Sequence, residues 1–108
     1  MMYYDFTAGG KDYKLRINTR NIVQLENKLG CNPLAIFGDG ETIPTVTSMV
    51  TVLHASLQQY QHSISFEDAY NIFDAYLEDG NAITDFVAII LEVYKVSGIV
   101  PKEVNEKN

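Results

Sequence analysis

Apolar and polar residues follow two different periods along the chain. In the N-terminal segment they alternate, with Tyr13, Leu15 and Ile17 on one face, as in a half-buried β-strand. From residue 20 onward, apolar residues recur at steps of three and four, which is typical of amphipathic helices. The pattern therefore predicts an α+β fold that is predominantly α, with an N-terminal β-hairpin packed on a bundle of about four helices.

The hairpin is predicted over residues 2–18. The aromatic-rich order MYYDFTA and the alternating order YKLRIN flank the sequence GGKD at residues 9–12, whose glycines are typical of a tight turn. An isolated hairpin has little stability in water. We therefore expect the face formed by Tyr13, Leu15 and Ile17 to pack on the helices.

The first two helices are predicted at residues 20–29 and 45–61. Thr19 is the expected N-cap of the first, and Gly30 and Pro33 should end it. Proline is tolerated at a first helical position, so Pro33 is also expected to begin a short helical turn. The second helix has the clearest apolar stripe, formed by Val46, Met49, Val50, Leu53, Leu57 and Tyr60.

Two further helices are predicted at residues 66–79 and 82–97. Ser65 and Asp68 have the spacing of a capping box at the start of the first of these. Its expected buried face consists of Phe66, Ala69, Tyr70, Phe73 and Leu77. Residues 1–100 are expected to form a single domain, and the polar tail at residues 101–108 is expected to be disordered.

The stretch from residue 83 to residue 100 is the most apolar in the chain, and we expect it to be the central helix. One row should face the core: Phe86, Val87, Ile90, Leu91 and Tyr94. A second apolar row exceeds what one stripe needs, and it is the predicted binding surface for a partner or a second copy: Ile89, Val93, Val96, Ile99 and Val100. The pattern also allows a well-packed monomer in which this row meets the hairpin. Val52 is a further apolar residue expected at the surface.

Length and charge narrow the class of protein. A chain of 108 residues with a formal charge of −6 and only eight scattered Lys and Arg fits one small domain and argues against nucleic-acid binding. Cys31 is the sole cysteine, so no internal disulfide can form. The N-terminus lacks the pattern of a secretory signal, and the apolar run is interrupted by charges, so we expect a cytoplasmic protein that does not enter the membrane.

Candidate catalytic and metal-binding chemistry is sparse. His54 and His62 do not have the spacing of a metal-ligand pair. A solvated acidic face accounts for a group of carboxylates: Asp74, Glu78, Asp79 and Asp85. The sequence contains no phosphate-binding loop, calcium-binding loop or nucleophile elbow. It therefore predicts a protein that is not an enzyme and that binds neither a metal nor a cofactor.

Three stretches resemble a known protein family. They are YKLRINTRNIVQLENKLGCNPLAIF at residues 13–37, LHASLQQYQHSISFEDAY at residues 53–70 and FVAIILEVYKVSG at residues 86–98. In order and spacing they are similar to the tail assembly chaperones of long-tailed phages and prophages of Gram-positive bacteria. The resemblance spans nearly the whole predicted domain, and none of the matching motifs is catalytic.

The resemblance implies a non-enzymatic protein that acts in the cytoplasm of the bacterial host and is absent from the mature virion. Such chaperones bind the tape measure protein and keep it soluble while tail tube subunits polymerise around it. A homo-oligomer is expected, and the tail tube protein is a further candidate partner. The same features allow a structural tail or connector protein that stays in the virion, and the composition also fits a small regulatory adaptor of the host.

Overall fold

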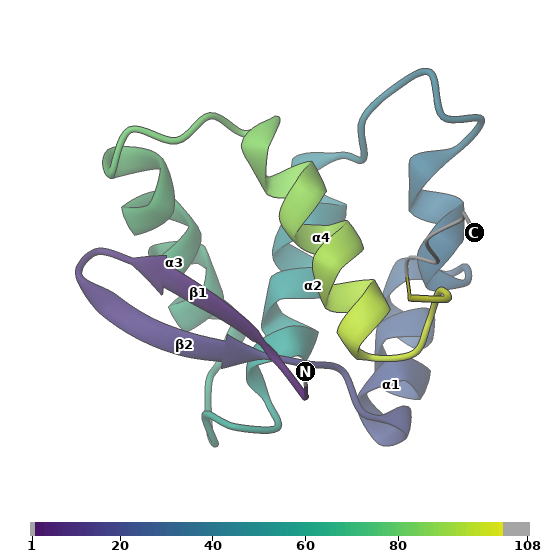
Figure 1. Cartoon of the computed structure of the whole chain (residues 1–108), viewed down its shortest axis with the longest axis horizontal. Coiled ribbons are helices and arrows are strands. Elements are labelled where there is room, and N and C mark those ends of the chain that lie inside the picture. Colours follow the sequence, from purple (N-terminus) through teal and green to yellow (C-terminus); the bar gives the residue numbers. More distant parts are fainter. Residues whose placement is uncertain (1, 103–108) are drawn as a thin grey trace.

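The computed structural model describes residues 2–102, which form a β-hairpin followed by a set of helices (Figure 1). The elements are β1 (Tyr4–Ala8), β2 (Lys11–Leu15), α1 (Thr19–Leu29), the 3-10 helix η1 (Pro33–Phe37), α2 (Val46–Leu57), α3 (Phe66–Glu78) and α4 (Asp85–Val96). The predicted α+β fold, predominantly α with an N-terminal hairpin, is confirmed. Of the predicted tail at residues 101–108, only Pro101 and Lys102 are described, without regular structure, and the remainder lies outside the described residues.

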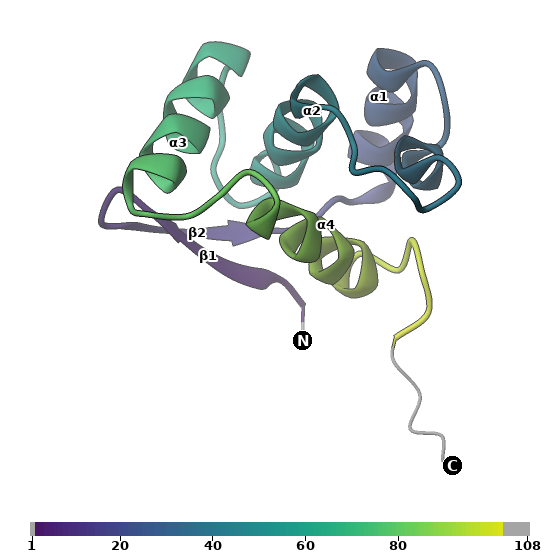
Figure 2. The ribbon, with the colours of Figure 1, turned by 90° about the horizontal axis from the view of Figure 1, so that it is seen from above.

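The elements form two layers. Figure 2 shows α1, α2 and α3 side by side, with the hairpin and α4 together on one side of them. α2 occupies the middle, in contact with α1, α3, α4 and β2. The prediction that residues 83–100 form the central helix is therefore wrong, because α2 is the helix that neighbours surround.

The sequence of α2 permits this central position. Eight of its 12 residues are buried, including Val52, which was expected at the surface. Thr51 and Ser56 are among the eight, and their hydroxyl groups donate to the carbonyl oxygens of Thr47 and Val52 in the same helix, each at 2.7 Å. Because these polar groups are satisfied internally, the helix can be covered on nearly every side without unpaired donors.

The ends of α2 differ from the prediction. The helix stops at Leu57 instead of continuing to residue 61. Val46 and Tyr60, both placed in the buried stripe by the pattern, are exposed. They lie at the two ends of the stripe, Val46 at the first residue of α2 and Tyr60 beyond its last residue.

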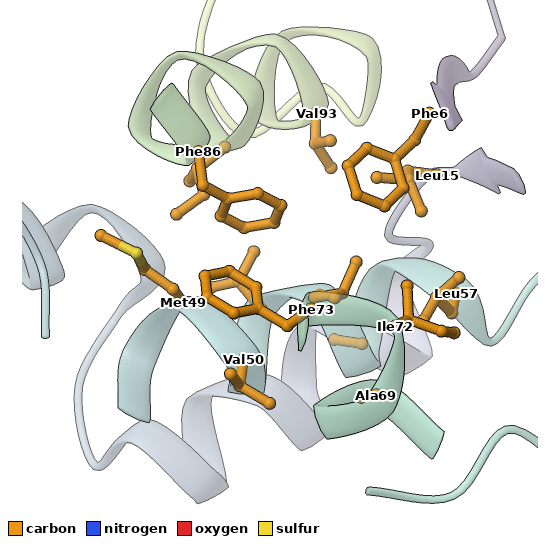
Figure 3. Close-up of a cluster of buried hydrophobic side chains, with 14 of the residues drawn as sticks. Phe6, Leu15, Met49, Val50, Leu57, Ala69, Ile72, Phe73, Phe86 and Val93 are labelled. Atoms are coloured by element: carbon orange, nitrogen blue, oxygen red, sulfur yellow. The ribbon is translucent and has the colours of Figure 1, made fainter. Parts of the chain in front are cut away.

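The hairpin supplies one wall of the core. β1 and β2 are antiparallel, with Tyr4 opposite Leu15 and Ala8 opposite Lys11. Leu15 and Ile17 are completely buried, as predicted, and Tyr13 is half-buried. Figure 3 shows the buried cluster in which side chains of the hairpin, α3 and α4 meet, among them Phe6, Leu15, Phe73, Phe86 and Val93.

Helix capping agrees in part with the prediction. The capping box of α3 is confirmed: Ser65 N donates to Asp68 at 2.9 Å, and Asp68 N donates to Ser65 Oγ at 3.0 Å. The N-cap of α1 is Asn18, whose side-chain oxygen accepts from Asn21 N at 2.9 Å, and not Thr19. Gly30 ends α1 in the left-handed conformation that the sequence predicted, with φ 74°.

The buried face of α3 is rotated from the predicted one. It consists of Ala69, Ile72, Phe73 and Tyr76. Tyr70, assigned to the core by its spacing, is 50% exposed. The reason is that α3 contacts β1 as well as α2, so the side of the helix that carries Ile72 and Tyr76 is covered.

Within the described part of the chain, residues 2–102, the helices are too short or too polar to span a membrane.

Candidate functional site at the end of α4

The predicted partner-binding residues of α4 divide into core and surface. Val93 is 1% exposed and belongs to the core, so its assignment to a binding surface is wrong. It follows Phe86 by seven residues, close to two helical turns, and therefore faces the same side. Ile89 and Val96 are half-buried on one flank of the helix. Leu91, expected in the core, is 39% exposed on another side.

The last turn of α4 ends in a Schellman motif. Gly98 has φ 79°, Gly98 N donates to Lys95 O at 3.2 Å, and Ile99 N donates to Tyr94 O at 2.9 Å. The chain turns back there, and the predicted partner residues Ile99 and Val100 pack half-buried against the core. They therefore extend the apolar flank that Val96 begins.

The segment between β2 and α1 holds this end of α4 in place. Arg16 Nε donates to Val96 O at 3.4 Å, and Ile17 N donates to Ser97 Oγ at 2.9 Å. A cation at the C-terminal end of a helix is also favoured by the helix dipole. Sequence reasoning missed Arg16 because 80 residues separate it from its partner and no local pattern connects the two.

A buried tyrosine holds α4 from the opposite direction. The Tyr94 hydroxyl donates to Pro33 O of η1 at 2.9 Å, and its ring lies edge-on to Phe37 with 6.2 Å between centroids. Burial raises the pKa of the Tyr94 hydroxyl well above its usual value of 10.0. The hydroxyl therefore stays protonated and acts as a structural donor.

Two hollows meet at Val96. An open groove of about 530 Å³ is lined by the apolar side chains of Val96, Ile99, Val100 and Pro101, and the cations around it are Arg16, Lys95 and Lys102. A hollow of about 270 Å³ on the other side is lined by Tyr3, Tyr4, Asp5, Glu92 and Val96. Lys95 forms an ion pair with Glu92 at 3.3 Å. The surface thus combines apolar contact area with charges of both signs.

The side chains considered for chemistry are not brought together as a metal site. Within residues 2–102, no group of three or more His, Cys, Asp and Glu is placed to hold a metal ion. His54 stacks on Phe66 with 4.5 Å between ring centroids, whereas His62 is exposed in the turn before α3. Cys31 is half-buried just after α1. What the α4 groove offers is apolar contact and charge, which suits a polypeptide ligand.

The fold and the groove define a small, predominantly helical α+β domain with a half-buried apolar surface at the end of its last helix. The chain belongs to DUF6096, a family of unknown function, which it matches over residues 5–108. No curated protein matches the chain, and no solved structure does.

Proposed function

We propose that this protein is a non-enzymatic tail assembly chaperone of a phage or prophage, which binds the tape measure protein and keeps it soluble during assembly of the tail tube. The observation that carries the proposal is the apolar flank of Val96, Ile99 and Val100, which continues across the Schellman turn and is only partly buried. The resemblance of residues 13–37, 53–70 and 86–98 to the chaperone family supports it.

The proposed activity requires an apolar surface that is available without unfolding. Arg16 and Tyr94 anchor the end of α4 through hydrogen bonds to Val96 O and Pro33 O, so the groove is held in shape before a ligand arrives. A helix of the tape measure protein would place its apolar side chains on this flank, as helices do in other hydrophobic grooves. The surrounding cations would pair with acidic residues beside that stripe and orient the helix.

The proposal extends to assembly state and location. The protein forms a homo-oligomer, acts in the cytoplasm of the bacterial host, meets the tail tube protein as a further candidate partner and leaves before the virion is complete. The formal charge of −6 supports this role, because like-charged complexes repel one another and stay dispersed.

Co-expression with the tape measure protein tests the proposal. We expect the wild-type chain to keep the tape measure protein in the soluble fraction and a Val96→Glu/Ile99→Glu variant to lose this effect. Leu91→Glu is the matched control, since Leu91 is an exposed apolar residue of the same helix outside the groove. A double variant that protects as well as the wild type would contradict the assignment of the site. A circular dichroism melt of each variant separates loss of binding from loss of folding, and Val96→Ser provides a milder change if the double variant melts early.

Mass spectrometry of purified particles tests the assembly role separately. A chaperone should be absent from the finished virion, whereas a structural tail or connector protein should be present in stoichiometric amount. Detection of the chain in purified virions would therefore replace the chaperone proposal with the structural one.

A further inference from the structure

A second groove lies between the N-terminal half of α2 and the middle of α3. Its volume is about 270 Å³, and it is lined by Val46, Thr47, Val50, Tyr70, Phe73 and Asp74. Val50 and Phe73 are 3% exposed and belong to the buried cluster (Figure 3), so they form its floor. Val46 is 44% exposed and Tyr70 is 50% exposed, so they form its walls. The groove therefore has a buried apolar floor and two apolar side chains available for contact.

The exposed side of α3 carries uncompensated negative charge, which borders this groove at Asp74. Glu67, Asp74 and Glu78 are separated by seven and four residues, so they follow one side of the helix beside Tyr70. α3 contains no Lys or Arg. Within residues 2–102, none of the three carboxylates forms a salt bridge or a hydrogen bond through its side chain.

The other two carboxylates at the ends of α3 are used differently. Asp68 closes the capping box with Ser65, and Asp79 accepts a hydrogen bond from Gly9 N at 2.9 Å. The fold thus employs the terminal carboxylates in its own structure and leaves the row beside the groove unpaired. Like charges four residues apart on a helix repel each other modestly, and a cationic ligand would remove that repulsion.

We infer that this groove binds an amphipathic helix of another protein whose apolar stripe is flanked by Lys or Arg. Apolar side chains at steps of three and four would enter between Val46 and Tyr70, and the basic residues would face Glu67, Asp74 and Glu78. An exposed tyrosine above a buried apolar floor is a favourable anchor for such a contact. This surface is distinct from the α4 groove, and the inference does not rest on the proposed function.

The charges of this chain argue against a second copy as the occupant. Among its described helices, α1 carries Arg20 and Lys28, α4 carries Lys95, and α2 and α3 have neither Lys nor Arg. Lys28 lies over the ring of Phe66 at 4.6 Å, and Lys95 is paired with Glu92. None of these helices presents a basic row that could match the three carboxylates, so the complementary helix belongs to a different protein.

Two designed peptides provide the test. Both are helices of about 18 residues with the same Leu and Ala stripe, one flanked by Lys and the other by Glu, a length sufficient for partial helicity in water. The full chain is titrated with each peptide and followed by fluorescence anisotropy and amide NMR shifts. We expect the Lys peptide to bind about tenfold more tightly than the Glu peptide at low salt and to shift the amides of Val46, Val50 and Tyr70.

Variants of the chain assign the contacts. Tyr70→Ser should weaken the Lys peptide about tenfold. Leu91→Ser, a comparable change at an exposed apolar residue of α4, should not change its affinity. Asp74→Lys/Glu78→Lys should reverse the preference, so that the Glu peptide binds better. Any of three results would overturn the inference. The two peptides could bind equally well, or the amide shifts could be confined to the α4 groove. Copies of the chain could also pair through this groove, in which case Tyr70→Ser would lower the mass measured by sedimentation.

Discussion

Replacing Tyr94 with phenylalanine removes one oxygen atom from the place where α4 meets η1. The Tyr94 side chain is completely buried, and its hydroxyl donates to Pro33 O at 2.9 Å. Phenylalanine keeps the ring and its edge-on contact with Phe37. The substitution therefore tests the hydrogen bond alone, without creating a large cavity.

The expected cost follows from the burial of both partners. An average intramolecular hydrogen bond contributes about 1 kcal/mol, and leaving a buried acceptor without its donor costs roughly 1–3 kcal/mol. Pro33 is itself buried, so water does not readily replace the hydroxyl. We expect the free energy of unfolding to fall by about 1–2 kcal/mol. For a domain of this size, that corresponds to a melting temperature lower by roughly 5–10 °C.

Urea denaturation followed by circular dichroism at neutral pH measures this change. Tyr70→Phe is the matched control, because Tyr70 is half-exposed and its hydroxyl forms no hydrogen bond with a described residue. The control should change stability by less than about 0.5 kcal/mol. If Tyr94→Phe proves as stable as the wild type, or if the control costs as much, the hydrogen bond to Pro33 does not hold α4 in place.

Alkaline pH gives an independent measure of the same group. The pKa of Tyr94 is raised in the folded chain, so the unfolded chain loses this proton first as the pH rises above 10.0. The stability that depends on the protonated hydroxyl is therefore complete below that pH and declines above it. Tyr94→Phe should show a shallower decline. Tyr4 and Tyr76, whose pKa values burial also raises, should leave part of the slope in place.

Two further predictions concern the buried residues of α4 and His54, which stacks on Phe66. In urea denaturation, Val93→Ala should lower the free energy of unfolding by about 2 kcal/mol and Val96→Ala by less than about 1 kcal/mol. The reason is that Val93 is buried and Val96 is only partly buried. Equal costs would contradict the division of α4 into core and surface residues. Burial, and then the nearby Lys28, lower the pKa of His54 in the folded chain. As the pH falls below 6.5, the unfolded chain therefore takes up this proton first. The stability that depends on neutral His54 should be complete above pH 6.5 and decline below it. His54→Gln should flatten that acid slope when unfolding is measured at about pH 5 and pH 7.5, and an unchanged slope would exclude His54 as its source.

Local interactions explain which parts of the structure were predictable. The hairpin, the four helices, the capping box of Ser65 and the termination at Gly30 all depend on residues within a few positions of one another. Periodicity, caps and turn glycines report such short-range preferences directly. The sequence by itself therefore determined the elements and their order, and it also placed Val96, Ile99 and Val100 among the residues of the candidate surface.

The tertiary structure alone decided how those elements face one another. Periodicity identifies a broad apolar arc on a helix, but the part of that arc that becomes buried depends on neighbours distant in sequence. For this reason Val93 lies in the core and Tyr70 is exposed, both contrary to the pattern. α2 is the central helix, a position that its internally bonded hydroxyls permit, and Arg16 donates to Val96 O across 80 residues. The groove between α2 and α3 arises from such long-range packing, whereas the α4 groove combines the contiguous residues 95–102 with the distant Arg16.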